Sequence, residues 1–152
     1  PDNPLILVAE SIEKPGNLGT MLRSSDAAGV DAVIVCDKCT DINNPNVVRA
    51  SVGTLFTVQV AEASTTETIE WLRRRSITSL AATPSATDLC YDVDMKGGVA
   101  IVVGSEQYGL HEEWMNGADR KVLIPMRGRA DSLNVAAAAT ILLFEAQRQR
   151  LL

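Results

Sequence analysis

The sequence predicts an α/β fold with a parallel sheet of about six strands and flanking helices. Short runs such as residues 5–9, 31–36 and 99–103 are apolar at almost every position. Strands that are buried on both faces of a parallel sheet show this pattern. Helical patterns separate the runs, and the resulting alternation is typical of α/β layers. The 152 residues, 46% hydrophobic and 22% charged, suit one globular domain.

The expected strands are short runs rich in Val, Ile, Leu and Ala, at residues 5–9, 31–36, 57–61, 77–82, 99–103 and 121–125. The expected helices lie between them, at residues 17–28, 45–52, 66–75, 111–116 and 132–151. Asn17 and Ser132 belong to residue types that cap helix N-termini, so we expect both to be N-caps. Arg73, Arg74 and Arg75 are expected to end their helix, because cations are favourable near a helix C-terminus.

The final expected helix, residues 132–151, is the most informative element. At about 20 residues it would extend ~30 Å. The run from Ala136 to Ala139 presents small side chains on every face, and polar residues appear only near the end, at Glu145 and beyond Gln147. A helix that is apolar almost all round must be buried on most sides. We therefore expect a second subunit to supply part of that burial.

The composition limits the possible classes of function. The net charge of −5 argues mildly against a freestanding nucleic-acid binder. Residues 120–150 nevertheless carry six basic side chains against two acidic ones, a local net charge of +4 that allows an anionic partner there. The longest nearly apolar run, residues 135–144, is too short for a membrane span, which needs about 20 residues. With no signal peptide and only three cysteines, we expect a cytoplasmic protein without a disulfide framework.

The glycine pair Gly104 and Gly109 has the spacing of a phosphate loop. Leu110 and His111 stand where such a loop needs Lys and Ser or Thr, which argues strongly against a nucleoside-triphosphate site. Two interpretations remain open at this point. The segment is either a glycine turn at the carboxyl end of a strand, where α/β sheets place ligands, or a plain turn.

We interpret the C-x-x-C spacing of Cys36 and Cys39 as incidental. Only Cys90 and His111 could complete a zinc site with it, so we predict unpaired thiols and no metal. The single histidine leaves little room for Ser-His-Asp or Cys-His catalysis. We expect His111 on an exposed helix face beside two glutamates.

Polar residues in three segments stand where packing would favour apolar ones. The first segment holds Asn17 and Arg23, the second Glu106, and the third Ser132 and Asn134. In order and spacing, these segments resemble the three motifs of the SpoU (TrmH-like) branch of the SPOUT RNA methyltransferases. The matching stretches are Glu13-Lys-Pro-Gly-Asn-Leu-Gly-Thr-Met-Leu-Arg23, Ile101-Val-Val-Gly-Ser-Glu-Gln-Tyr-Gly-Leu110, Ile124-Pro-Met-Arg-Gly128 and Ser132-Leu-Asn-Val-Ala136. Residues 46–53 also match, so the resemblance covers nearly the whole chain.

The resemblance implies the SPOUT fold, with a C-terminal deep trefoil knot, in a homodimer. It also implies S-adenosyl-L-methionine as cofactor and methylation of a ribose 2′-hydroxyl in RNA, with 23S rRNA as the expected substrate. Matching positions assign cofactor binding to Gly104, Ile124, Leu133, Met126 and Thr83. They assign catalysis to Arg23, Asn17, Glu106, Ser132 and Asn134. Many members also carry an N-terminal RNA-binding domain, to which nothing in residues 1–152 corresponds, so we expect this chain to be the catalytic domain alone.

The family gives Arg23 the role of base toward the ribose hydroxyl. Because a guanidinium stays protonated in proteins, we instead expect Arg23 to act as a cation that makes the hydroxyl more acidic. Three alternatives remain open: a tRNA substrate, a non-catalytic RNA-binding dimer of the same fold, and a small-molecule enzyme with the same cofactor pocket. The combination of Arg23, Glu106 and Asn134 favours a catalyst over a non-catalytic dimer.

Overall fold

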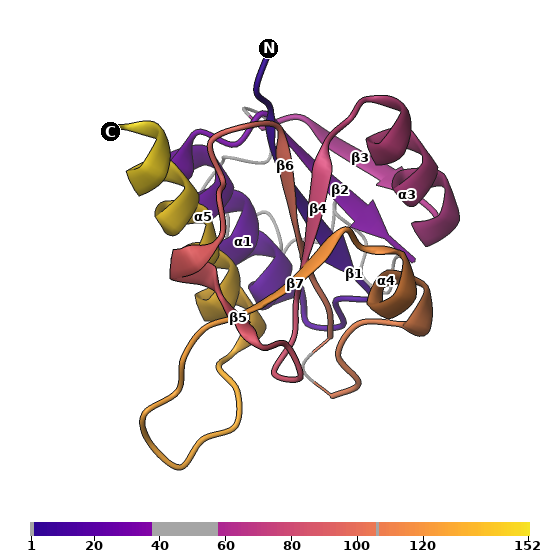
Figure 1. The fold of residues 1–152 in the computed structure, drawn as a ribbon. Helices are drawn as coiled ribbons and strands as arrows, with labels where there is room; N and C mark the ends of the chain where they lie inside the picture. The colour runs from indigo at the N-terminus through magenta and orange to yellow at the C-terminus, as the bar shows by residue number, and fades with distance from the viewer. Residues whose placement is uncertain (1, 38–57, 106) are drawn as a thin grey trace.

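The structure is a computed structural model that describes residues 2–37, 58–105 and 107–152 (Figure 1). In this part of the chain, seven strands form one sheet in the order β3-β2-β1-β6-β4-β7-β5, and every pairing is parallel. The strands are β1 (Leu5–Glu10), β2 (Ala32–Cys36), β3 (Val60–Ala63), β4 (Thr78–Ala82), β5 (Asp88–Leu89), β6 (Val99–Val103) and β7 (Arg120–Leu123). The predicted α/β class and parallel sheet are confirmed.

Two pairs of helices cover the two faces of the sheet. α1 (Pro15–Ala28) and α5 (Val135–Arg150) pack together on one face, as Figure 1 shows. α3 (Thr65–Arg74) and α4 (Glu112–Gly117) lie on the other face, and a short 3-10 helix, η2 (Cys90–Asp92), follows β5. The order of layers is therefore helix, sheet, helix.

The central strand β1 contributes to two separate hydrophobic cores. Leu5 and Leu7 pack with α1 and α5, whereas Ile6 and Val8 pack with Leu72 of α3 and with α4. Successive side chains of a strand point to opposite faces, so a strand covered on both sides must be apolar throughout. This burial explains why the run could be recognised in the sequence.

Some strand and helix boundaries differ from the sequence-based expectation. β5 has only two residues and gives no recognisable pattern, so the sheet has one strand more than expected. β3 lies at Val60–Ala63 rather than at residues 57–61, because pairing with β2 sets its register and its half-exposed side chains leave no clear pattern. The helix expected at residues 45–52 lies outside the described residues.

Both predicted N-caps are wrong. α1 begins at Pro15, with Lys14 as its N-cap, so Asn17 lies inside the first turn. Proline suits a first helical position because its φ is already helical and its missing N–H is not needed there. α5 begins at Val135, and its N-cap is Asn134 rather than Ser132, because the Asn134 side chain accepts from the next turn's backbone N–H groups.

The helix α5 is buried along most of its length, as its apolar sequence predicts. It is linked to α1 by a 2.7 Å hydrogen bond between the hydroxyls of Ser24 and Thr140. Near its end, the guanidinium of Arg150 donates to four backbone carbonyl groups, those of Asn3, Pro4, Met95 and Gly97. These contacts fasten the end of the last helix to the segments that precede β1 and β6.

No helix in the described residues is long and apolar enough to cross a membrane.

Candidate active site

A cavity of about 530 Å³ opens at the carboxyl ends of β4, β6 and β7. Its wall comes from the residues that follow each of these strands, from the loop after β7 and from the first turns of α5. Ligand sites of α/β sheets lie at this edge, and the volume is in the range of small-molecule pockets. The loop between β7 and α5 projects from the body of the domain in Figure 1.

All five residues predicted to bind a cofactor line this cavity. They come from every part of its wall: Thr83 after β4, Gly104 after β6, Ile124 and Met126 after β7, and Leu133 before α5. The backbone N–H of Thr83 donates to the carbonyl of Val122 at 3.0 Å, which joins two of these segments. The structure thus brings together positions that are far apart in the sequence.

The turn after β6 fits glycine alone at its first position. A Cβ atom on Gly104 would lie 2.5 Å from the carbonyl carbon of Gly109, closer than real Cβ contacts. The turn closes on itself, because the N–H of Gly109 donates to the Ser105 carbonyl at 2.8 Å and the N–H of Tyr108 to the Ser105 hydroxyl. Gly109 has a φ of 68°, in the left-handed region that favours glycine. The glycine spacing therefore reflects close backbone packing.

Of the predicted catalytic residues, the structure brings Asn17 and Asn134 into direct contact, with a hydrogen bond of 3.2 Å between their side-chain amides. Asn17 also lines a smaller cavity of about 130 Å³, which shares Ser105 and Val135 with the larger one. Ser132 lines the larger cavity. The two cavities are therefore neighbours, and the pair of asparagines lies beside both.

Arg23 and Glu106 are placed differently. Arg23 is exposed on α1 and lines neither of the two cavities. Glu106 lies outside the described residues. The structure thus does not bring Arg23 into the larger cavity of its own chain.

Sequence reasoning missed two charged residues in the cavity wall and one buried carboxylate beside it. Arg129 and Asp131 line the cavity from the loop after β7, and both lie in the basic segment 120–150. Glu10 ends β1 and is 0% exposed. A buried carboxylate needs hydrogen-bond donors. An acidic residue directly after an apolar strand was the available signal.

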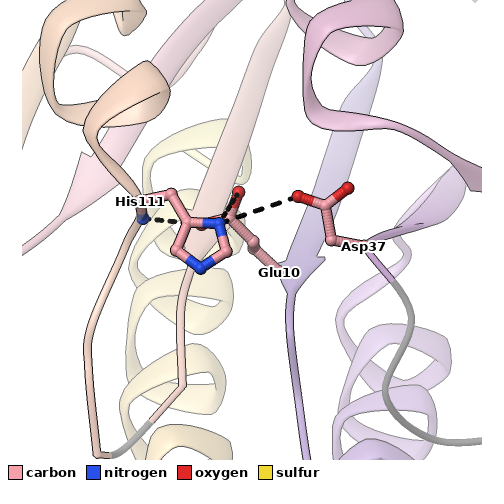
Figure 2. Close-up of side chains that lie close together, drawn as sticks. All are labelled: Glu10, Asp37 and His111. Carbon is pink, nitrogen blue, oxygen red and sulfur yellow. Dashed lines mark hydrogen bonds and ion pairs between the residues drawn. The ribbon is translucent and has the colours of Figure 1, made fainter.

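Glu10, Asp37 and His111 lie together, as Figure 2 shows. Nδ1 of His111 is 3.5 Å from Oε2 of Glu10 and 3.7 Å from Oδ2 of Asp37. His111 is exposed as expected, but it is the N-cap residue before α4 rather than a residue on the helix face, and its ring faces the two carboxylates. Among the described residues, this cluster has the donor atoms, all within 4.8 Å, that could hold a metal ion.

The two described cysteines are buried and unpaired. Burial raises the pKa of the Cys36 thiol to about 11, and the carboxylates of Glu10 and Asp37 act in the same direction. Burial also raises the pKa of the Cys90 thiol. Both sulfurs are therefore protonated and unreactive at neutral pH. The other half of the C-x-x-C pair, Cys39, lies outside the described residues.

The fold and the site together define a class of protein. A fully parallel α/β sheet carries a small-molecule cavity at its carboxyl edge, enclosed by a tight glycine turn and the start of a buried helix. This class is the α/β domain that binds a small molecule at the ends of its strands. Residues 4–144 match the SpoU rRNA Methylase family, and the chain belongs to that family.

Relatives of known name agree with this assignment. A 23S rRNA (uridine(2479)-2′-O)-methyltransferase from Streptomyces viridochromogenes is 36% identical, over 90% of this chain and 50% of that protein. A crystal structure of an RNA 2′-O ribose methyltransferase is 45% identical with a TM-score of 0.93, covering 100% of this chain and 58% of the other. An AdoMet-bound rRNA methyltransferase from Sinorhizobium meliloti is 36% identical with a TM-score of 0.93, covering 97% of this chain and 57% of the other.

The chain spans about half the length of the curated relatives it matches. The match to SPOUT-type structures confirms the fold class, with TM-scores of 0.93 and 0.95 for two of them. The deep trefoil knot and the homodimer stay predictions.

Proposed function

We propose that residues 1–152 are the catalytic domain of an enzyme that transfers a methyl group from S-adenosyl-L-methionine to a ribose 2′-hydroxyl of RNA, with 23S rRNA as the substrate. The observation that carries the proposal is the cavity of about 530 Å³, whose wall contains all five positions assigned to cofactor binding from the resemblance. The named relatives support the substrate class, since one is a 23S rRNA 2′-O-methyltransferase. One related structure was solved with AdoMet bound.

The volume and the lining of the cavity support a site for this cofactor. Gly104, Ile124 and Leu133 come from three different segments of its wall, and the family resemblance assigns their backbone groups to the adenine and ribose. Met126 and Thr83 complete the wall. At Gly104 a side chain would collide with the backbone of the turn. This close packing supports a wall of fixed shape at Gly104.

Bound S-adenosyl-L-methionine would supply a methyl group on a sulfonium centre, open to in-line attack by the ribose oxygen. The protein must hold that oxygen in line and make the hydroxyl more acidic, because an un-ionised hydroxyl is a poor nucleophile. Arg23 supplies a cation beside the hydroxyl, and the neighbouring RNA phosphate orients the hydroxyl or accepts the proton of the hydroxyl. Asn17, Glu106, Ser132 and Asn134 position the ribose and the motif loops.

A homodimer would complete this site. Arg23 is exposed on α1 and lies outside the cofactor cavity of its own chain, so it can act on the cavity of a partner subunit. Phe144 on α5 is an apolar side chain that is 38% exposed, which supports an interface along that helix.

Three measurements test the function. Calorimetry with S-adenosyl-L-methionine should show one site per chain. Methyl transfer should then be measured on bulk rRNA and on tRNA, and modified nucleotides should be mapped in RNA from cells with and without the gene. Loss of one 2′-O-methyl group from 23S rRNA supports the proposal. Methylation of tRNA alone would identify tRNA, rather than 23S rRNA, as the substrate. Cofactor binding without methyl transfer to either RNA would favour the non-catalytic dimer or a small-molecule substrate.

A further inference from the structure

Glu10 is a fully buried carboxylate at the carboxyl end of the central strand β1, with 0% of its surface exposed. Both of its oxygens have hydrogen-bond partners. Oε1 accepts from the backbone N–H of His111 at 2.8 Å, and Oε2 accepts from the hydroxyl of Thr65 at the start of α3. A charge-assisted bond of this kind, out of water, is stronger than an ordinary hydrogen bond. Glu10 therefore links three segments that are remote in sequence.

The partner of Oε1 is the end of the glycine turn. That turn leaves β6 at Gly104, is bridged internally between Ser105 and Gly109, and ends at His111, where α4 begins. Three of its residues, Gly104, Ser105 and Gly109, line the larger cavity. The backbone N–H of His111 thus connects Glu10 to one wall of that cavity.

The strand that carries Glu10 is a firm support for such a connection. β1 is buried along its whole length and is paired with β2 on one side and β6 on the other. Ala9 pairs with Val103, so Glu10 lies beside the point at which the turn leaves β6. Movement of Glu10 would require disruption of the centre of the sheet.

We propose that Glu10 is a positioning residue for cofactor binding. Its buried carboxylate holds the backbone N–H of His111 and so fixes the turn whose first residues form the cavity wall. Glu10 does not line the cavity and acts through the turn alone. The proposal rests on the proposed function in that the ligand of the cavity is S-adenosyl-L-methionine.

The side chain of His111 has a different role from its backbone. Its exposed ring contacts both carboxylates, yet the link to the turn runs through the main-chain N–H. His111 has a φ of −67°, which proline adopts without strain. His111→Pro therefore removes the backbone donor and the ring, whereas His111→Ala removes only the ring. The pair of variants separates the two contributions.

The experiment compares Glu10→Ala, Glu10→Gln, His111→Pro and His111→Ala with the wild-type chain. S-adenosyl-L-methionine affinity is measured by calorimetry well below each Tm, and amide hydrogen exchange is measured across residues 107–111 without cofactor. Glu10→Ala and His111→Pro should weaken binding by roughly tenfold, the cost of an unsatisfied buried partner, and speed exchange in the turn. Glu10→Gln, which keeps an acceptor for the N–H, and His111→Ala should stay within about twofold.

Gln149→Ala is the matched control. Gln149 is also a buried polar side chain, and it bonds the backbone N–H of Met95, the carbonyl of Val93 and the carboxylate of Glu145, none of which lines the cavity. Its replacement should lower Tm by a similar amount without changing cofactor affinity or exchange in the turn. This comparison separates a positioning role from a general loss of stability.

Four outcomes would overturn the proposal. Unchanged affinity and exchange in Glu10→Ala and His111→Pro would leave Glu10 a structural residue only. A loss in His111→Ala equal to that in His111→Pro would assign the effect to the ring. Loss of wild-type affinity in EDTA, restored by Zn²⁺ or Mn²⁺, would make the cluster a metal site. Failure of Glu10→Gln to rescue would exclude the hydrogen bond as the cause. If the wild-type chain binds no cofactor, the proposed function fails, while hydrogen exchange still decides whether Glu10 holds the turn.

Discussion

The side-chain amide of Asn134 donates a 3.2 Å hydrogen bond to Oδ1 of Asn17, across a separation of 117 positions. The same side chain uses its oxygen to cap α5, accepting from the N–H groups of Ala136 and Ala137 at 2.8 and 3.2 Å. Asn134 thus joins the first turn of α1 to the first turn of α5, and it is also the N-cap residue of α5. One residue combines a structural function and a position in the proposed site.

Substitution of Asn134 should separate these two functions. Asn134→Asp keeps the oxygen that caps α5 but removes the N–H₂ donor to Asn17. We expect it to retain most of the stability while methyl transfer falls sharply. Asn134→Ala should lose the cap as well, with about 1 kcal/mol lower free energy of unfolding. Chemical denaturation and a methyl-transfer assay measure the two quantities.

The control for this pair is Asp94→Ala, which removes a side-chain hydrogen bond to the backbone N–H of Lys96 and lines neither cavity. It should lower stability to a similar extent and leave methyl transfer intact. Full activity in Asn134→Asp would show that the bond to Asn17 has no part in the reaction.

Replacement of Gly104 should weaken cofactor binding. Even the single methyl group of Gly104→Ala would meet the Gly109 carbonyl carbon at 2.5 Å, so the turn must move away and the cavity wall with it. We expect at least tenfold weaker binding of S-adenosyl-L-methionine, about 1.4 kcal/mol. Gly97→Ala is the matched control, because the added Cβ meets nothing within 4 Å. Equal cofactor affinities of the two variants in calorimetry would show that the turn is not part of the cofactor site.

Arg23→Ala should abolish methyl transfer while cofactor affinity and self-association stay close to those of the wild type. Arg23 is exposed and lies outside the cavity of its own chain. Arg23→Lys should restore little activity, because an ammonium lacks the planar fork that contacts hydroxyl and phosphate together. Arg74→Ala, at the exposed end of α3, is the control and should remain active. A Lys variant of near-normal rate would contradict the bidentate role.

The Cys36 thiol should resist alkylation in the folded protein at neutral pH. Burial raises its pKa to about 11 from 9.0, so the thiolate is scarce and shielded. The folded state favours the protonated thiol, so this contribution to stability is full below pH 9 and is lost as pH rises through 11. Cys36→Ala should therefore lose less stability than the wild type over that interval. Peptide mapping after iodoacetamide treatment, native and unfolded, checks the reactivity, and rapid native labelling would contradict the burial.

RNA binding by the 152-residue chain should depend only weakly on salt. The chain has a net charge of −5, and its basic side chains are concentrated in residues 120–150, so few phosphates are neutralised. We expect a shallow slope of log affinity against log salt, and Arg127→Ala should reduce it by about one. Arg74→Ala on α3 should leave the slope unchanged. A steep slope that is the same in the wild type and in Arg127→Ala would show that RNA binds to another surface.

Most of the wall of the larger cavity could be predicted from the sequence because the segments after β6 and β7 and before α5 contain motifs, whereas the segment after β4 that holds Thr83 contains none. The long-range contacts could not be predicted. Glu10 appears in the sequence only as an acidic residue after an apolar strand, and its partner His111 is 101 positions away. No local spacing encodes that contact, because the sheet order creates it.

The exact ends of helices and the shortest strand also could not be predicted from the local sequence. Ser132 and Asn134 are both good N-cap residues, and only the hydrogen bonds to Ala136 and Ala137 show which one begins α5. β5, with two residues, is too short for any periodicity. Strands buried on both faces were recognised because burial constrains every residue in them.

The contacts of Arg150 have a consequence for the order in which the protein forms during synthesis. Its guanidinium reaches the carbonyls of Asn3 and Pro4, 147 and 146 positions earlier. Of the sheet, the central strand β1 is synthesised first. Its neighbour β6 and the helix α5, which carries Arg150, are synthesised much later. Until then β1 has an unpaired edge open to other chains. The ribosome must release nearly the whole domain before the sheet is complete, and such distant pairings form slowly.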